Sequence, residues 1–373
     1  MLKIYPVNLN NKTEVRRFIN FPFNLYKDCP QWVPPLVSSM RHDLNPQKHH
    51  FYKQGEMRLF LAEKDGMVRG RLAAMENRRF NEYLGQKTAF FGFYDVEEDL
   101  ECSQALFQAA FKWAVSRGLT RMIGPRALNT TDNTGILVEG FEHRAAMWLP
   151  YNYPYYDSFI KSAGFSKVTD HFSGYARGDE MMPERLIRIA QKIKDRRGFE
   201  VIHFKSLKDR KYWIPRVWTV LLEAFASFDE FVPPTEEEKK ATAADLISIA
   251  DPRLIKLIQK DGKLIGFIFA YHDITRGIQQ AKGRIWPLGW LCLMLDRKRT
   301  KWVNINGVGV LPEYQGMGVN AILYTEIKKS VEELGFEHID VVQVNEANFQ
   351  SRSDMENMGI RWYKSHRSYK REL

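Results

Sequence analysis

The hydrophobic pattern between Trp302 and Gly335 changes its period once. From Val303 to Val310, β-branched residues alternate as they do in a β-strand. Pro312 ends this strand, because proline has no N–H to donate to a sheet. After a glycine turn, apolar residues recur at helical spacing as far as Gly335. The stretch therefore predicts a strand, a glycine turn and a helix.

The same order of predicted elements occurs twice in the chain. Each copy has a strand and a helix, a Lys-Asp-Gly hairpin of two strands, a fourth strand, an amphipathic helix that ends in glycine, and a further strand. The matching segments are 4–7, 13–26, 59–62, 71–74, 89–96, 102–118 and 121–124 in the first copy, and 201–204, 212–226, 254–258, 267–271, 303–310, 319–335 and 338–344 in the second. The repeat predicts an α+β fold of two tandem domains, 1–178 and 179–373, each with a twisted mixed sheet flanked by helices.

The glycine turn of the second copy is a candidate anion site. Gly316 and Gly318 lie between the predicted strand and helix, where the free N–H groups of the first helical turn and the positive end of the helix dipole meet. Such a site suits a pyrophosphate, and a side chain at Gly318 is expected to occupy the space of the ligand. The alternative is a plain tight turn. The pattern is neither a dinucleotide-binding GxGxxG fingerprint nor a Walker loop.

Val310, Pro312, Gln315 and Gly318 resemble the phosphate loop of the GNAT superfamily of acyl-CoA-dependent N-acyltransferases, which reads Q/R-x-x-G-x-G/A after a strand and a V-x-P step. Asn320 stands where the family has glycine or alanine. The resemblance implies a cofactor site formed by Val308, Val310, Gln315, Gly316, Met317, Gly318, Val319 and Asn320.

A second family signature, an Asn followed by a helix that ends in L-Y-x-x-x-G-F, resembles Asn348 to Ile360. Met355 stands where the family has tyrosine. The resemblance implies transfer of an acyl group from an acyl-CoA, with acetyl-CoA as the expected donor, to a small-molecule or peptide amine by direct attack in a ternary complex. Asn306 and Asn348 are the candidate positioning residues.

The general base is not identified by the sequence. His272, Asp273 and Glu313 are weak candidates, and we expect each to be a solvated residue rather than a catalyst. Tyr363 and Tyr369 could replace the missing tyrosine acid. No metal-binding or Ser-His-Asp pattern is found, so a hydrolase and a metalloenzyme are not supported.

The two copies differ at the position of the glycine turn. The first copy has DVEEDLE at 95–101, whose carboxylates would repel a pyrophosphate. This segment is also compatible with an ordinary helix N-terminus. We therefore expect acyl-CoA binding in the second domain only.

The first copy contains an extra loop, 125–153, that is rich in Asn, Thr and aromatic residues. Such side chains can hydrogen-bond to a substrate or stack on it. In and beside this loop, the candidate substrate residues are Asp132, Asn152, Tyr155 and Tyr156. The alternative is an ordered loop that packs its own aromatics and bridges the two domains.

The second copy contains an insertion, 275–301, which combines the apolar run Ile285–Leu295 with flanking arginines and lysines. It could form part of the core or domain interface, a wall of the substrate pocket, or a membrane-surface patch. Core or interface is the interpretation we adopt, because tryptophan-rich apolar runs are usually buried.

The composition of the chain also predicts its compartment and its binding partners. The chain has 373 residues, a net charge of +10, a pI near 9.3 and three separated cysteines. It begins without a secretory signal, and its apolar run is too short to span a bilayer, so a cytoplasmic protein is expected. The basic charge is expected to serve coenzyme A more than nucleic acid. Two alternatives to the acyl-CoA enzyme stay open: an aminoacyl-tRNA-dependent transferase, and a non-catalytic tandem module that binds a ligand or partner.

Overall fold

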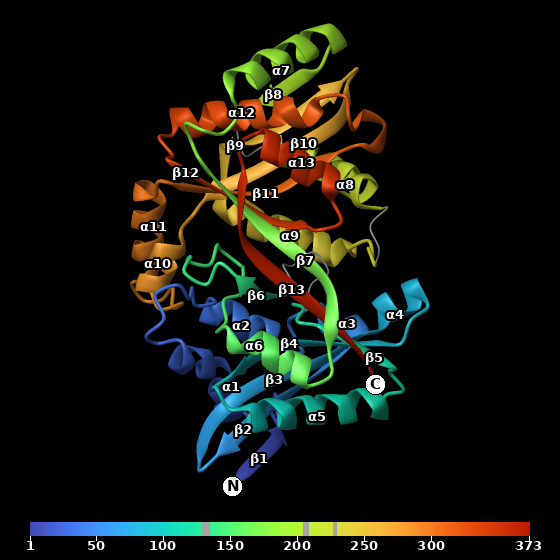
Figure 1. Cartoon of the computed structure of the whole chain (residues 1–373), viewed down its shortest axis with the longest axis vertical. Coiled ribbons are helices and arrows are strands. Elements are labelled where there is room, and N and C mark those ends of the chain that lie inside the picture. Colours follow the sequence, from blue (N-terminus) through green and yellow to red (C-terminus); the bar gives the residue numbers. More distant parts are fainter. Residues whose placement is uncertain (129–134, 204–208, 227–229) are drawn as a thin grey trace. The chain divides into compact units, whose positions relative to one another are not determined.

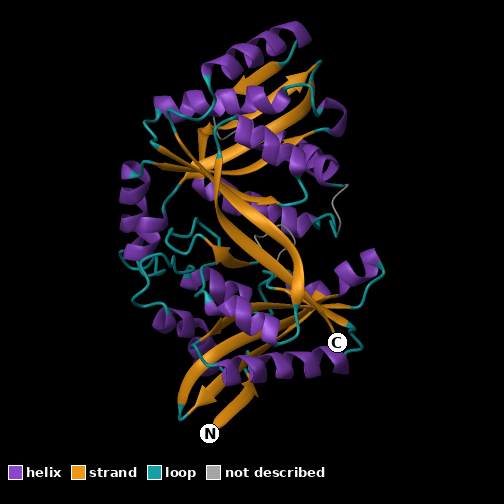
Figure 2. Ribbon diagram, in the orientation of Figure 1, coloured by secondary structure: helices purple, strands orange, loops and turns teal. Residues whose placement is uncertain are grey.

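The computed structural model describes residues 1–128, 135–203, 209–226 and 230–373 and divides the chain into two compact units. Unit 1 consists of Met1–His171, Thr275–Asp296 and Lys364–Leu373, and unit 2 of Phe172–Ile274 and Arg297–Tyr363. Both combine helices with a mixed sheet, so the predicted fold class is confirmed (Figures 1 and 2). The boundaries of these units differ from the predicted division at residue 178, because each unit contains segments from both sides of it. That division stays a prediction about the sequence repeat.

Unit 1 has the strand order β1-β2-β3-β4-β5-β13, with β6 paired to β13. Its strands are β1 (Leu2–Pro6), β2 (Gly55–Lys64), β3 (Met67–Asn77), β4 (Thr88–Val96), β5 (Arg121–Gly124) and β6 (Ile136–Glu139). Its helices are α1 (Lys12–Leu25), α2 (Val37–Asp43), α3 (Phe51–Gln54), α4 (Arg78–Leu84), α5 (Leu100–Ser116), α6 (Tyr155–Ser162) and α10 (Thr275–Gln280), together with most of α11 (Gly289–Arg299).

Unit 2 has the strand order β7-β12-β11-β10-β9-β8. Its strands include β8 (Glu200–His203), β9 (Ala250–Lys260), β10 (Lys263–His272), β11 (Trp302–Val310) and β12 (His338–Asn345), and its helices are α7 (Glu184–Arg197), α8 (Arg210–Phe225), α9 (Glu236–Ile249), α12 (Val319–Glu333) and α13 (Phe349–Asn357), with the 3-10 turn η2 (Pro312–Tyr314). Strands β7 (Ser166–Arg177) and β13 (Arg361–Glu372) contribute residues to both units.

The two units repeat one pattern of strand pairing. In unit 1, β1 to β4 pair antiparallel in order and β4 pairs parallel with β5. In unit 2, β8 to β11 pair antiparallel in order and β11 pairs parallel with β12. Both β2-β3 and β9-β10 turn through an Asp-Gly pair with positive φ at both residues, a turn whose twist matches that of the strands. The pairing thus follows the order that the sequence repeat predicted.

Each sheet is covered by the helix that follows its fourth strand. Helix α5 packs on β2 and β3, and α12 packs on β9, β10 and α7. The apolar stripe of α12 is almost wholly buried, which agrees with the helical spacing in the sequence.

The insertion 275–301 departs from the expected core segment. Helix α10 buries Thr275, Gly277 and Ile278, but α11 buries none of its residues. The apolar run was expected to be buried, and for α11 this expectation is wrong. Among the described helices, none is both long and apolar enough to cross a membrane.

Candidate functional site

The separation of β11 from β12 defines the centre of the candidate site in unit 2. Parallel pairing runs from Trp302 opposite His338 to Ile305 opposite Val341 and ends there, although both strands continue. A β-bulge follows directly. Between the pairs Ala270–Ile305 and Ile268–Val308, β11 has two residues where β10 has one. Gly307 adopts φ +107° in this bulge. The backbone of β11 is thereby released from β12 but remains paired with β10.

The released backbone offers two hydrogen-bond donors. The Leu311 N–H donates to the Ile265 carbonyl on β10 at 2.9 Å. Because backbone groups alternate along a strand, the N–H groups of Val308 and Val310 point away from β10, toward the side that β12 has left. On this side, the Gln315 side-chain amide donates a hydrogen bond to the Val310 carbonyl at 3.2 Å.

The glycine turn leaves the first turn of α12 uncapped. Gly316 and Gly318 have φ of +70° and +87°, and Gly318 is the N-cap without a side-chain cap. Gln315 and Met317 donate their N–H groups within the turn, to Pro312 and Tyr314. In the described part of the chain, the N–H groups of Gly316, Gly318 and residues 319–321 have no such acceptor. These N–H groups lie where the glycine spacing predicted an anion site, and that role stays a prediction.

The two glycines differ in the space around them. A Cβ on Gly316 would meet no heavy atom within 4 Å, whereas a Cβ on Gly318 would lie 2.7 Å from Cδ1 of Ile193 on α7. The expectation that a side chain at Gly318 would enter ligand space is therefore wrong. The open position is Gly316, and Gly318 allows α7 to pack against the turn.

Two further family positions make contacts within the protein. Asn320, on the first turn of α12, reaches Asp354 on α13 at 3.4 Å. Asn348 caps α13 by accepting the N–H of Ser351 at 3.1 Å. The role of Asn348 in positioning a substrate stays a prediction, because its observed contact is a helix cap.

A row of buried polar side chains crosses the sheet just before the strands separate. Gly266 packs against Val319, so the even-numbered residues of β10 face α12 and Tyr271 faces the other side. Register pairs Tyr271 with Asn304, and Asn304 with Asp340. Since paired residues share a face, the three lie in one row. Burial raises the pKa of Tyr271, and the amide of the predicted positioning residue Asn306 opposes this rise.

Asn304 and Asp340 are the polar groups of this row that a substrate could use. Asn304 is fully buried, and both of its amide atoms are without a hydrogen-bond partner among the described residues. One such unsatisfied group costs about 1–3 kcal/mol, so its burial requires an explanation. Asp340 is 3% exposed and accepts the Tyr363 hydroxyl at 2.7 Å. The sequence analysis missed Asp340; an acid within a buried strand pattern was the available signal.

In the described residues of unit 1, the helix that corresponds to α12 does not begin at an uncapped turn. Asp99 caps α5 by accepting the N–H of Cys102, and its carboxylate lies 3.0 Å from the Lys64 ammonium. Three further carboxylates of the acidic segment pair with cations: Asp95 with Arg71, Glu97 with Arg69 and Glu101 with Lys64. A carboxylate that caps a helix N-terminus disfavours a phosphate at the same position, because the two negative charges repel.

In unit 1, the chain after β5 remains hydrogen-bonded to β4 beyond the last paired residues of the two strands. Pairing of β4 with β5 ends at Phe90 opposite Ile123, and the Arg126 N–H then donates to the Phe91 carbonyl at 2.8 Å. The chain after β5 is thus still bonded to β4 beyond their last paired residues, whereas the pairing of β11 with β12 ends at Ile305 opposite Val341.

The predicted substrate residues of the first copy are engaged in local contacts. Asn152 is buried and binds the N–H and carbonyl of Leu137, which holds β6. Tyr156 is fully buried, and its hydroxyl lies 2.8 Å from that of Tyr26. The Tyr155 hydroxyl donates to Val96 at 2.7 Å. Asp132 lies outside the described residues. A substrate role for the four residues stays a prediction.

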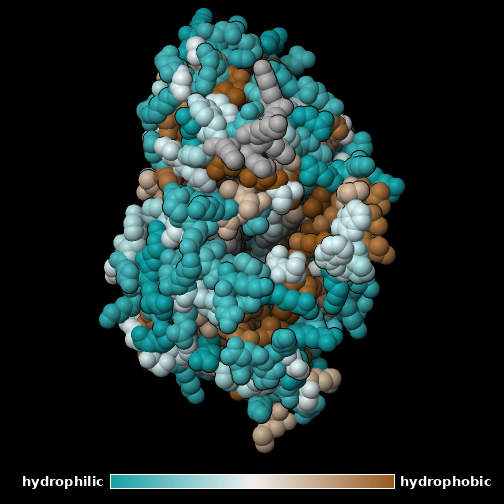
Figure 3. Space-filling view, turned by 180° about the vertical axis from the view of Figure 1, so that it is seen from behind, coloured by the Kyte–Doolittle hydropathy of each residue, from teal (hydrophilic) through white to brown (hydrophobic). Residues whose placement is uncertain are grey.

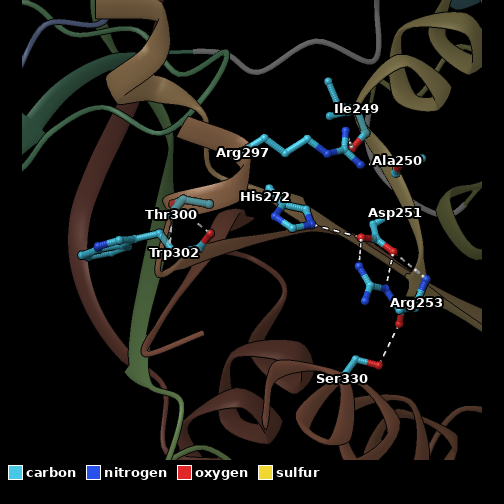
Figure 4. Close-up of polar contacts among 9 residues, drawn as sticks. All are labelled: Ile249, Ala250, Asp251, Arg253, His272, Arg297, Thr300, Trp302 and Ser330. Atoms are coloured by element: carbon cyan, nitrogen blue, oxygen red, sulfur yellow. Dashed lines mark hydrogen bonds and ion pairs between the residues drawn. The ribbon is translucent and has the colours of Figure 1, made fainter. Parts of the chain in front are cut away.

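His272, one of the candidate bases, belongs to a different network. It pairs with Val303 and faces α12, on the opposite side of the sheet from Asn304. Its Nε2 lies 3.1 Å from the Asp251 carboxylate, which also binds Arg253 (Figure 4). Burial opposes ionisation of Asp251, but these hydrogen bonds hold its pKa well below the usual range. The network fixes the start of β9 on β10.

The other candidate acids and bases are engaged elsewhere. Glu313 is half exposed and pairs with Lys263 at 2.8 Å. Asp273 is buried at the end of β10, and its N–H donates to Trp302. The Tyr369 hydroxyl donates to Asp157 in unit 1. Tyr363 alone among these residues reaches the polar row.

Among the described residues, one group of side chains has the spacing of metal ligands, although the sequence predicted no metal. His42, Asp43 and His49 place ligand atoms within 4.8 Å of one another. The His49 Nδ1 accepts the Phe51 N–H at 3.2 Å, and burial lowers the His49 pKa to about 4. The neutral ring therefore carries its proton on Nε2, which leaves no lone pair there for a metal. We assign no metal to this group.

Residues 218–360 match the model of the acetyltransferase (GNAT) family. Two relatives match nearly the whole chain. A bacterial ceramide synthase of Caulobacter vibrioides is 28% identical, over 100% of this chain and 98% of its own. Protein YghO of Escherichia coli is 26% identical, over 97% of this chain and 94% of its own.

Solved structures show the same architecture at low identity. A tandem GNAT protein from the clavulanic acid biosynthesis pathway has a TM-score of 0.58 at 12% identity, with 100% of this chain and 98% of that chain covered. A GCN5-related N-acetyltransferase from Sphaerobacter thermophilus has a TM-score of 0.54 at 14% identity, with 100% and 95% covered. The fold is therefore that of tandem GNAT proteins.

Proposed function

Because residues 218–360 match the model of the GNAT acetyltransferase family, we propose that this protein is an acyl-CoA-dependent N-acyltransferase with one cofactor site, in unit 2. The observation that carries the proposal is the difference between the two helices that follow the fourth strands. Helix α12 begins at a glycine without a side-chain cap, beside the point where β11 and β12 stop pairing. Helix α5 begins at the capping carboxylate of Asp99, in the unit where the chain after β5 remains bonded to β4.

The backbone around the glycine turn would hold the cofactor. The free N–H groups of Gly316, Gly318 and residues 319–321 suit the pyrophosphate of coenzyme A. The N–H groups of Val308 and Val310 suit the acyl carbonyl, and they would stabilise the oxyanion that develops as the amine attacks. Positioning of the amine and the thioester together supplies much of the rate enhancement in such a transfer.

Asp340 is the general base that we propose. It lies one residue before the strands separate, on the face opposite α12, and it is the only acid of the polar row among the described residues. As the amine nitrogen bonds to the thioester carbon, the Asp340 carboxylate would take the proton of the amine, and the Tyr363 hydroxyl would hold that carboxylate in place. The C–S bond would then break, and the proton would pass to the departing thiolate to give free coenzyme A. The unpartnered Asn304 amide would hydrogen-bond to the acceptor.

A long-chain amino alcohol is the acceptor class that we favour, with a fatty acyl-CoA as donor. The support is the relative named as a bacterial ceramide synthase, which this chain matches over its whole length. A ceramide is the amide of a fatty acid and such an amino alcohol. Acetyl-CoA with a small-molecule or peptide amine, the pair expected from the sequence, is the competing pair.

Calorimetry with coenzyme A, followed by a thiol-release assay, tests the proposal. We expect one site per chain, and release that requires both an acyl-CoA and an amine. Palmitoyl-CoA or acetyl-CoA, each with sphinganine or spermidine, separates the two substrate classes. Two equivalent sites, or no binding, would overturn the cofactor assignment. Binding without turnover of any amine would favour a binding module, and acylation that requires charged tRNA would favour the tRNA-dependent transferase.

A further inference from the structure

Large hydrophobic side chains are concentrated on the surface of residues 282–299, here called the interfacial segment, which contains α11. Fifteen large hydrophobic side chains are exposed in the described part of the chain, and five of them lie between residues 286 and 295. They are Trp286 at 81%, Leu288 at 66%, Trp290 at 41%, Met294 at 45% and Leu295 at 46% exposed. Figure 3 shows hydrophobic residues gathered at the edge of the molecule where α11 lies. Such a concentration marks an interaction surface.

The exposed side of α11 changes from apolar to cationic along its length. Trp290, Met294 and Lys298 follow one another at intervals of one helical turn and are all exposed. Leu295 and Arg299 form a second exposed stripe beside them. Each stripe therefore presents an apolar group first and a cation one turn later.

Charge in this part of the chain has one sign. Residues 275–301 contain seven arginines and lysines and one acid, which gives +6 of the net +10 of the whole chain. The single acid, Asp296, accepts the Gly277 N–H at 2.6 Å. An exposed surface with this charge is complementary to an anionic partner.

We propose that the interfacial segment binds the surface of a lipid bilayer that contains anionic lipids. Tryptophan, leucine and methionine would enter the boundary between headgroups and acyl chains, and Lys298 and Arg299 would pair with lipid phosphates. Helix α11 has 11 residues, so it lies in this boundary and does not cross the membrane. The inference rests on exposure and charge alone, independently of the proposed reaction.

Co-sedimentation of the full chain with vesicles tests the inference. We expect binding to vesicles of phosphatidylglycerol and phosphatidylcholine, weaker binding in high salt, and little binding to pure phosphatidylcholine. A Lys298→Glu/Arg299→Glu variant should bind at least tenfold more weakly, because each cation near an anionic surface contributes severalfold to affinity. Its matched control is Arg196→Glu/Arg197→Glu, which reverses two exposed cations in the last turn of α7.

The apolar contribution needs its own pair of variants. Trp286→Ser alters a side chain outside any helix and should weaken vesicle binding severalfold, whereas Met67→Ser, at a 54% exposed position of β3, should not. Coenzyme A affinity and thermal unfolding should be unchanged in all four variants, which separates this test from that of the reaction. Absence of binding to anionic vesicles, or equal losses in the test and control variants, would overturn the inference. A dimer that Trp286→Ser dissociates would assign the surface to a second copy of the chain instead.

Discussion

Gly316 provides the sharpest test of the cofactor site. A side chain there would point into open space, because a Cβ would meet no heavy atom within 4 Å. In the proposed complex this space belongs to the pyrophosphate. Gly316→Val should therefore keep the phosphates away from at least one free N–H group of the turn. Hydrogen bonds to charged groups contribute about 1.5–3 kcal/mol each, so coenzyme A affinity should fall by about 10-fold to 150-fold.

Backbone strain must be separated from the loss of ligand contact. Gly316 has φ +70°, and a side chain in the left-handed region costs about 1–2 kcal/mol. Gly262, in the hairpin between β9 and β10, has φ +77° and is equally open. Gly262→Val is thus a control for strain in the same unit, away from the glycine turn.

Two measurements decide the outcome. Chemical denaturation should show similar losses of unfolding free energy, about 1–2 kcal/mol, for the two variants. Calorimetry with coenzyme A should show weaker binding only for Gly316→Val. Equal affinity for both variants and the unaltered protein would refute the assignment of the phosphates to this turn.

The remaining predictions concern side chains. Asp340→Asn should lower kcat about 100-fold to 10,000-fold, with coenzyme A affinity unchanged, because it removes the proposed base and keeps an acceptor for Tyr363; retention of more than a tenth of kcat would exclude Asp340 as the base. Tyr363→Phe should lower the unfolding free energy by about 1–3 kcal/mol, measured by denaturation, since it leaves the buried Asp340 without this donor. Asp251→Asn should cost about 1–3 kcal/mol in the same assay without changing coenzyme A affinity, because its network reaches Ser330 in the C-terminal half of α12 and not the glycine turn at the start of this helix. Burial lowers the pKa of His366 to about 3, so the unfolded chain, with an ordinary histidine pKa near 6.5, binds the proton first as pH falls. The contribution of His366 to the free energy of unfolding should therefore be complete above about pH 6.5 and about 2 kcal/mol smaller at pH 5. The His366→Gln variant should lack this part of the pH dependence.

The sequence by itself determined the repeated order of elements and the glycine turn. Period-two and helical hydrophobic patterns are local, so strands such as β4, β5 and β11 and the helix α12 could be placed to within a few residues. Positive φ at Gly316 and Gly318 follows from the same local chemistry. The asymmetry between the two copies was also readable, because a carboxylate cap and a glycine cap differ in the residues themselves.

Only the tertiary structure decided which residues meet. Asn304 and Asp340 are far apart in the sequence, and parallel pairing of β11 with β12 brings them side by side. The different surroundings of the two glycines depend on how α7 packs, and no local pattern reports that packing. Likewise, the apolar run of α11 has the composition of a core helix, and its exposure is set by the elements around it. The hydrophobic composition of a segment determines how much apolar surface it can bury. The neighbouring elements in the fold determine whether that surface is buried.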